Sequence, residues 1–292
     1  MLSIVCFGEV LWDVFDTHKK IGGAPLNVAL RLNAFGNKTA IISAVGNDPE
    51  GEELLSYLKE HRLNTTHIRI HKEFKTGMVN VSLNNAGVAS YTIEHPAAWD
   101  NIEGTPANKA LVKQADALVY GSLASRDAVS KQTLIDLIGV ANFKIFDINL
   151  RAPHYNYKDL QFLMDQADMI KFNEEELTEL CASLGKSYPS LTDQLNFISE
   201  KTNTHTICIT LGEKGAVLLN HGMLYTNTGY TVKVLDTVGA GDAFLGTFIH
   251  YLLSENNPQK ALDYACAAGA LVASKAGANP KIEEKDILDL VG

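Results

Sequence analysis

Short apolar runs of strand length alternate with segments of helical periodicity along most of the chain. This alternation is typical of βαβ units, in which helices connect parallel strands. The predicted strands lie at residues 3–8, 39–45, 115–120, 144–148, 169–172 and 206–211. The predicted helices among them lie at residues 24–35, 49–61, 128–139 and 174–184. The pattern therefore predicts an α/β fold built on an open, doubly wound and mainly parallel sheet.

Residues 68–93 break this alternation, because short strands follow one another there without a helix between them. The strands predicted in this region are 68–71, 77–83 and 89–93, with a turn at 84–87. Together with residues 10–15 they predict a small antiparallel sheet that stands off the main one. Toward the C-terminus the pattern predicts a β-meander at 215–234 and helices at 239–253, 259–275 and 283–291.

The composition and net charge of the chain limit which kinds of molecule it can bind. The 292 residues are 46% hydrophobic and 20% charged, as in folded proteins, and no repeat or long linker divides them. The net charge of −9 argues against nucleic acid and anionic membrane surfaces as partners. A small phosphate stays compatible with it, because a few backbone amides and one metal ion can hold one locally.

The cysteines and the N-terminus indicate a cytoplasmic protein. Cys6, Cys181, Cys208 and Cys266 form no C-x-x-C pair and lie in apolar stretches, so we expect buried thiols rather than disulfides or a zinc site. The first residues lack a basic segment, and no apolar run reaches the roughly 18 residues of a membrane span.

The most informative stretch runs from Asp236 through Gly239-Ala240-Gly241 to Asp242, where a predicted strand enters a glycine-rich turn that opens an apolar helix. Such a turn lets successive N–H groups point one way at the positive end of a helix, which forms an anion site. Asp242 would suit a base that takes a proton from a hydroxyl attacking a phosphoryl group. The same residues also suit a tight turn with Asp242 facing the helix dipole. Two carboxylates around the turn favour a metal–phosphate site.

A second glycine pair, Gly22-Gly23, leads into the helix that starts at Ala24-Pro25 and carries Asn27. Proline is well tolerated in the first helical turn, where its missing N–H has no partner to lose. The glycines permit close approach of a ligand, and the Asn27 amide can both donate to and accept from sugar hydroxyls. Taken alone, this stretch also suits a purely structural turn.

Together these stretches closely resemble the two signatures of the ribokinase-like (PfkB-type) carbohydrate kinases, and the likeness covers essentially the whole chain. The stretches are Gly22-Gly23-Ala24-Pro25-Leu26-Asn27-Val28-Ala29 and Asp236-Thr237-Val238-Gly239-Ala240-Gly241-Asp242-Ala243-Phe244. The resemblance implies a three-layer α/β/α ribokinase-like fold, with a single kinase core over residues 1–292 and a small antiparallel β-sheet lid formed by about 9–21 and 68–100. It implies an ATP-dependent sugar kinase that phosphorylates a primary hydroxyl, and the motifs lie closest to those of bacterial fructokinases.

The resemblance also implies roles for individual residues. Asp242 would be the general base, and the other catalytic positions would be Gly239, Ala240, Gly241 and Arg151. The sugar would contact Asp13, Gly22, Gly23, Asn27, Asn149, Arg151 and Asp242. The nucleotide would contact Asn173, Thr210, Gly212, Gly215, Gly239, Gly241 and Asn279. Glu176 would hold Mg²⁺ through water, and a K⁺ ion is expected at Asp236, Val238 and Ala276.

Two departures from the family pattern keep the substrate open. Cys266 stands where many ribokinases have an asparagine near the adenine, and residues 91–100 lack the lid arginine that fructokinases often carry. Ribokinase, 2-keto-3-deoxygluconate kinase and nucleoside kinase remain alternatives to fructokinase. A non-catalytic sugar-sensing protein remains an alternative from another class, against which the intact Asp242 argues. The resemblance also implies a homodimer formed through the lid, and such pairing would cover edge strands that are otherwise exposed.

Overall fold

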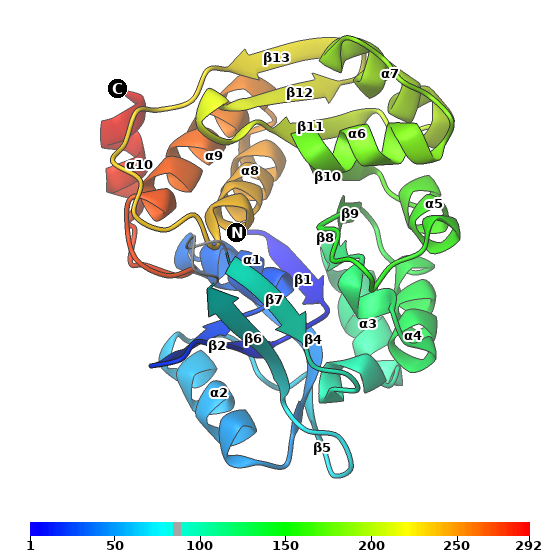
Figure 1. Cartoon of the computed structure of the whole chain (residues 1–292), viewed down its shortest axis with the longest axis vertical. Helices are drawn as coiled ribbons and strands as arrows, with labels where there is room; N and C mark the ends of the chain where they lie inside the picture. The colour runs from blue at the N-terminus through cyan, green and yellow to red at the C-terminus, as the bar shows by residue number, and fades with distance from the viewer. Residues whose placement is uncertain (84–88) are drawn as a thin grey trace.

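The computed structural model describes residues 1–83 and 89–292, so the predicted turn at 84–87 lies outside the described residues. Its main sheet has nine strands in the order β13-β12-β11-β10-β9-β8-β1-β4-β5 (Figure 1). In chain order these strands are β1 (Ser3–Phe7), β4 (Lys38–Gly46), β5 (Ile68–His71), β8 (Ala117–Gly121), β9 (Lys144–Asp147), β10 (Met169–Asn173), β11 (Thr206–Thr210), β12 (Ala216–Asn220) and β13 (Met223–Asn227). The pairs from β5 to β11 are parallel, and β12 and β13 continue the sheet antiparallel. The mainly parallel sheet is therefore confirmed.

Helices cover both faces of this sheet (Figure 1). They are α1 (Ala24–Ala34), α2 (Pro49–Glu60), α3 (Pro106–Gln114), α4 (Ala128–Ile138), α5 (Tyr157–Asp165), α6 (Glu174–Ser183), α7 (Leu191–Thr202), α8 (Ala240–Glu255), α9 (Pro258–Ala273) and α10 (Glu284–Val291). Successive residues of a strand point to opposite faces. Accordingly, Val5 and Phe7 of β1 pack in one core with α3 to α7, whereas Ile4 and Cys6 pack in the other with α1, α2, α8 and α9. The three-layer α/β/α architecture is confirmed.

A second, four-stranded sheet has the order β3-β2-β6-β7. Its strands are β2 (Leu11–Val14), β3 (Lys19–Gly22), β6 (Gly77–Leu83) and β7 (Ala89–Ile93). The outer pairs, β2–β3 and β6–β7, are antiparallel, and the central β2–β6 pair is parallel. The small sheet is thus present where the sequence predicts one.

The predicted place of residues 68–71 is wrong, because these residues do not join the small sheet. They form β5, which pairs with β4 at the edge of the main sheet, Ser43 opposite Ile68. Since α2 separates β4 from β5, the three elements form one more βαβ unit. Alternating apolar and polar residues predict a strand equally well in either sheet, so the choice of sheet was not readable from the pattern.

The prediction of a strand leading into the turn at Gly239 is also wrong. The β-meander ends with β13 at Asn227, and residues 228–239 have no regular secondary structure. Instead, the amides of Leu235 and Asp236 both donate to the carbonyl of Ala273 at the end of α9. The segment is therefore held by the C-terminal helices rather than by a sheet.

Helices α3, α5 and α7 and strand β3 were not predicted. Each of the three helices begins with a side-chain cap, from Thr105, Asn156 and Ser190, so the helix starts carried a usable signal. All four cysteines are buried and unpaired, as expected. Within the described ranges, none of the helices combines the length and apolar character that crossing a bilayer requires.

Candidate active site

Charged side chains gather where parallel strands β1, β9 and β10 end at their carboxyl edge. Glu9 follows β1, Asp147 ends β9, and Lys171 lies in β10. The first turn of α8 brings Asp242 to the same edge, where its electrostatic effect reaches each of these groups. Ligands of open α/β sheets bind at this edge, so the location itself favours a binding site.

Asp242 is held by a chain of side-chain amides. The Asn27 amide nitrogen, on α1, donates to Asp242 Oδ2 over 2.7 Å. The Asn279 amide nitrogen donates in turn to Asn27 Oδ1, also over 2.7 Å. Asn279 was predicted as a nucleotide contact, and the structure places it two hydrogen bonds from Asp242. The chain orients the Asp242 carboxylate and leaves its second oxygen for another partner.

The pKa of Asp242 is raised to about 6. Burial is the main cause, and the nearby Asp147 carboxylate acts in the same direction. The hydrogen bond from Asn27 and the positive charges of Lys171 and Arg151 oppose this rise. A carboxylate with this pKa is ionised at neutral pH and is a stronger base than an ordinary aspartate.

The turn before α8 needs glycine at its first position. Gly239 has φ of 78°, and a Cβ there would lie 2.6 Å from both Cα and the carbonyl oxygen of Ala278. The Ala240 amide donates to Thr237. The amides of Gly241 and Asp242, at the next helical positions, have no partner within the helix. These N–H groups at the positive end of α8 can hold an anion.

The predicted sugar-binding residues lie around the start of α1 and the small sheet. Gly22 pairs with Leu11, and a Cβ on Gly22 would collide with the Asp13 carboxylate. Gly23 has φ of 112°, and a Cβ there would collide with the carbonyl of Glu9. The glycine pair therefore lets strand β3 and helix α1 close tightly on Glu9 and Asp13.

Asp13 and Arg151 interact electrostatically. Burial raises the pKa of Asp13 to about 6, and the positive charges of Arg151 and Lys20 oppose the rise. The exposed Arg151 guanidinium donates to the Leu150 carbonyl over 2.9 Å. The neighbouring Asn149 has φ of 43°, close to the left-handed region that asparagine adopts more readily than most other residues. The loop after β9 thus presents a cation to the carboxylates of the site.

Glu176 and Asn173 form a reciprocal cap at the start of α6. The Asn173 side chain accepts from the Glu176 amide, and Glu176 Oε2 accepts from the Asn173 amide, each over 2.8 Å. Glu176 Oε1 accepts from the Leu150 amide over 2.9 Å. Glu176 therefore ties α6 to the loop after β9. Burial raises its pKa, against the charge of Lys171.

Thr210, Gly212 and Gly215 lie one strand farther along the same edge. Thr210 ends β11, and its hydroxyl donates to the Phe172 carbonyl over 3.3 Å. Gly212 and Gly215 have φ of 61° and 88° in the turn that follows. A Cβ on Gly215 would collide with the backbone of Asn227 and Gly229, so this turn also needs glycine.

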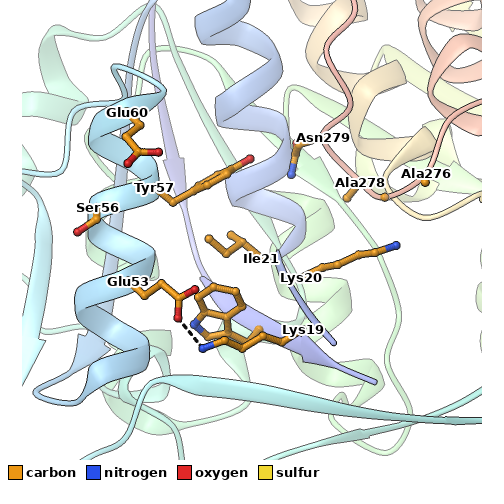
Figure 2. Close-up of a pocket in the computed structure, with 12 residues that line it drawn as sticks. Lys19, Lys20, Ile21, Glu53, Ser56, Tyr57, Glu60, Ala276, Ala278 and Asn279 are labelled. Atoms are coloured by element: carbon orange, nitrogen blue, oxygen red, sulfur yellow. Dashed lines mark hydrogen bonds and ion pairs between the residues drawn. The ribbon is translucent and has the colours of Figure 1, made fainter. Parts of the chain in front are cut away.

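Asp236, Val238 and Ala276 lie in two adjoining loops. Asp236 Oδ1 accepts from the Val238 amide over 3.1 Å, and Oδ2 accepts from the Gly277 amide over 2.9 Å. These bonds and the charge of Lys20 hold the pKa of Asp236 below its usual value, although burial acts the other way. Ala276 lines a pocket of about 600 Å³ between the loop at residues 276–279, the small sheet and α2 (Figure 2).

The model of the pfkB family of carbohydrate kinases matches residues 2–285 of the chain. The chain belongs to this family. Among its relatives is fructokinase-2 of Solanum lycopersicum, 28% identical over 308 residues that cover 96% of this chain and 92% of the relative. A protein described as a sugar kinase from Pyrococcus horikoshii is 31% identical over 301 residues, covering 94% and 91%.

Solved structures of carbohydrate kinases share the fold. The structure of the Pyrococcus horikoshii sugar kinase in complex with ATP has a TM-score of 0.83 at 28% identity, covering 98% of this chain and 97% of that one. A fructokinase from Vibrio cholerae with bound fructose, ADP and calcium has a TM-score of 0.84 at 25% identity, covering 100% and 99%. This protein is thus a PfkB-family carbohydrate kinase, and both of these solved structures hold an adenine nucleotide.

Sequence reasoning missed Lys171 of this kinase. Its Nζ lies 2.8 Å from Asp147 Oδ1, and both side chains are buried. A Cβ on Gly241 would lie 3.7 Å from the same Nζ, so the ammonium sits beside the glycine turn. Burial acts to lower the pKa of Lys171, but the carboxylates of Asp147 and Glu176 outweigh it and raise the pKa. A lysine inside the apolar strand of residues 169–173 was the available signal.

Glu9, which follows β1, also has no role assigned from the sequence. Burial raises its pKa to about 7, with the Asp242 charge adding to the rise and Arg151 opposing it. Its Oε2 is buried and has no hydrogen-bond partner in the described part of the chain. A buried carboxyl with this pKa changes its charge near neutral pH, beside the proposed base.

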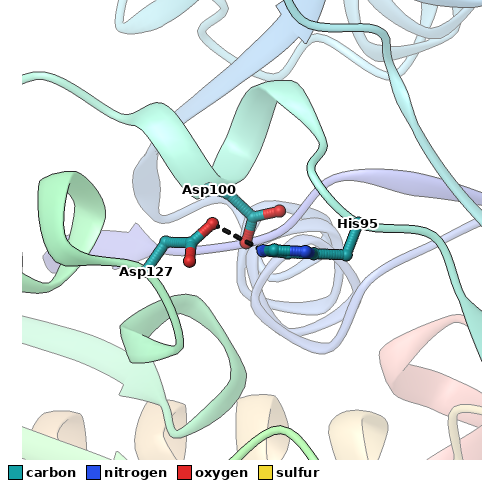
Figure 3. Close-up of side chains that lie close together, drawn as sticks. All are labelled: His95, Asp100 and Asp127. Carbon is teal, nitrogen blue, oxygen red and sulfur yellow. Dashed lines mark hydrogen bonds and ion pairs between the residues drawn. The ribbon is translucent and has the colours of Figure 1, made fainter.

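A separate cluster, His95, Asp100 and Asp127, has the geometry of a metal site but already holds a cation (Figure 3). The buried Arg126 guanidinium bonds both oxygens of Asp100, over 2.6 and 2.7 Å, and stacks on the Trp99 ring. His95 Nε2 lies 2.8 Å from Asp127 Oδ2. The Arg126–Asp100 pair gives this cluster a structural explanation.

Proposed function

We propose that this kinase transfers the γ-phosphoryl group of ATP to a primary hydroxyl of a small sugar, and that the sugar is fructose. The observation that carries the proposal is the Asp242 carboxylate, held by Asn27 over 2.7 Å at the start of α8 and beside the glycine turn. The relatives named fructokinase, one of them solved with fructose and ADP, support the choice of sugar.

In the proposed reaction, Asp242 takes the proton of the sugar hydroxyl as the oxygen attacks the γ-phosphorus. The amides of the turn at residues 239–242 stabilise the charge that develops on the phosphoryl oxygens. Lys171, next to Gly241, adds a fixed positive charge beneath them. The sugar is oriented for in-line attack by Asp13, Gly23, Asn27 and Arg151.

The residues present fit a divalent cation such as Mg²⁺. Asp147 Oδ2 is buried and lacks a hydrogen-bond partner among residues 1–83 and 89–292, so it can accept from a metal-bound water. Glu176, whose two oxygens accept backbone amides, would contribute through water as well. When bound, Mg²⁺ neutralises charge on the nucleotide phosphates.

We propose that the small sheet, with residues 9–21, 77–83 and 89–100, is a lid on a single kinase core, covering the sugar and excluding water from it. Its outer strands β3 and β7 have one unpaired edge each within the described sheet, and Tyr91 of β7 is exposed. Such an edge supports the proposed homodimer, whose mass light scattering would measure. The cytoplasmic location stays a prediction.

Asp242→Asn tests the proposed base. Turnover should fall by about 10³-fold while the dissociation constant for the sugar stays within a few-fold of the unsubstituted value, since general-base catalysis contributes this order of rate. Asp289→Asn, an exposed aspartate of α10, is the matched control and should keep full turnover. Near-normal turnover in Asp242→Asn would overturn the assignment.

A substrate panel decides the sugar. ADP release should be fastest with fructose when fructose, ribose, 2-keto-3-deoxygluconate and nucleosides are compared in a coupled assay. Faster release with another substrate would replace fructose and leave the kinase chemistry in place. If the protein binds a sugar but forms no ADP with any substrate of the panel, the sugar-sensing alternative is favoured.

A further inference from the structure

Lys20 of strand β3 reaches out of the small sheet to the loop before α8. Its Nζ lies 3.4 Å from Asp236 Oδ2, and the two side chains are 34% and 24% exposed. Figure 2 shows Lys20 extending from its strand toward the loop that carries Ala276 and Ala278. Its side chain passes along Gly277, where a Cβ would lie 3.7 Å from both Cδ and Nζ.

Asp236 is connected to the anion-binding turn through short backbone links. It accepts the amides of Val238, which precedes Gly239, and of Gly277, which precedes Ala278. Ala278 in turn packs against Gly239 so closely that no Cβ fits between them. The charge balance at Asp236 therefore bears on the shape of the turn beside Asp242.

This arrangement disagrees with a K⁺ ion bound at Asp236. One carboxylate carries one negative charge, and the carbonyls of Val238 and Ala276 add none. The Lys20 ammonium already lies 3.4 Å from one of its oxygens. A K⁺ ion bound directly to the same carboxylate, with no water between them, would lie within a few ångströms of the ammonium and be repelled by it.

We propose that the Lys20 ammonium is the resident cation of this loop, in place of a free monovalent ion, so that this kinase does not depend on added K⁺. The proposal rests on the proposed kinase function. Lys20 belongs to strand β3, so the position of the small sheet determines whether its ammonium lies beside Asp236.

The other groups that face Lys20 are consistent with this role. On the neighbouring strand, Asp13 is its direct cross-strand partner, and the positive charge of Lys20 opposes the rise that burial causes in the pKa of Asp13. The Phe15 ring centroid lies 5.5 Å from Nζ. Lys20 thus stands between Asp13, proposed to bind the sugar, and Asp236, which supports the anion-binding turn.

The test compares K⁺ with tetramethylammonium, a cation too large for such a loop, at equal ionic strength. The unsubstituted kinase should give the same rate and the same thermal midpoint in both salts. Lys20→Gln should lose about tenfold in rate in tetramethylammonium and regain it in K⁺, the size of an ordinary coupling between sites. Its thermal midpoint should rise with K⁺, because an ion that binds only the folded state stabilises it.

Two further variants sharpen the test. Lys19→Gln removes the neighbouring lysine, which pairs with Glu53 on α2, and should behave like the unsubstituted protein in both salts. Lys20→Arg keeps the charge and should stay independent of K⁺, even if Lys20→Gln does not fold.

Two results would overturn the proposal. One is a severalfold activation of the unsubstituted kinase by K⁺, and the other is a Lys20→Gln variant with unchanged rate and thermal midpoint in both salts. If no variant phosphorylates any sugar, the proposed function fails, whereas the comparison of thermal midpoints still decides the role of Lys20.

Discussion

Two lysine–aspartate pairs lie near the turn at residues 239–242, and they differ mainly in burial. In the pair beneath the turn, the side chains of Lys171 and Asp147 are 8% and 6% exposed, and their charged atoms lie 2.8 Å apart. In the pair at the rim, the side chains of Lys20 and Asp236 are 34% and 24% exposed, with 3.4 Å between charged atoms. The same two residue types therefore serve under different physical conditions.

Burial decides whether the loss of one charge destabilises the fold or changes only the active site. Removing one partner of a buried pair leaves an unpaired charge away from water, which costs far more than the pair contributes. Removing one partner of a partly exposed pair leaves a charge that water solvates. We therefore expect Lys171 to support both folding and catalysis, and Lys20 to adjust the site without supporting the fold.

The largest effect is expected from Lys171→Met. The free energy of unfolding should fall by about 3–5 kcal/mol, because the Asp147 carboxylate would stay buried without its cation. Urea unfolding at neutral pH measures the loss. The double variant Lys171→Met with Asp147→Leu should recover much of the stability but not the turnover. A loss below about 1 kcal/mol, the range of exposed pairs, would remove the distinction between the two pairs.

The next largest effect is expected in the pH dependence of turnover, which the buried carboxylates around Asp242 control. Turnover should fall about tenfold per pH unit below pH 6, because Asp242, with a pKa of about 6, must be ionised to act as a base. A pH profile of kcat measures this limb. Glu9 has a pKa of about 7 and repels the Asp242 carboxylate when both are charged. Glu9→Gln removes this repulsion, so the pH at which turnover falls should move lower.

Stability should respond to pH in the opposite direction. The pKa values of Asp242, Asp13 and Glu9 are raised above those of the unfolded chain, so the folded state binds more protons as pH falls from 7 toward 4. These groups therefore favour folding at lower pH while activity is lost. Thermal unfolding at each pH of the profile checks this. A thermal midpoint that falls together with the activity would mean that unfolding causes the loss.

The smallest effect is expected from Lys20→Gln on stability. The free energy of unfolding should change by no more than about 1 kcal/mol, and added salt should reduce the difference. Because the pKa of Asp236 is lowered, the contribution of this pair is present at neutral pH and is lost as pH falls below about 4, near the unfolded value. Urea unfolding of Lys20→Gln and Lys19→Gln at pH 7 and at about pH 2, below the unfolded value, tests both statements. A loss of several kcal/mol would make the rim pair equivalent to the buried one.

Much of the fold was readable from local patterns. The parallel strands follow apolar runs, and α1, α2, α8 and α9 begin near proline or glycine signals. The choice of sheet for β5 was not readable, because a four-residue strand with alternating polarity suits either sheet. Nor was the irregular course of residues 228–239, whose backbone bonds to the distant end of α9.

By itself, the sequence determined the two glycine turns and the carboxylate of Asp242 at the start of a helix. Glycine conformation and helix ends depend on residues next to one another, so local sequence is enough for both. Only the tertiary structure decided that Asn27 and Asn279 orient Asp242, and that one lysine is buried beside Asp147 while another reaches Asp236 at the rim. These contacts join residues 24 to 252 positions apart, and the energy of each charge depends on the burial that the whole fold creates.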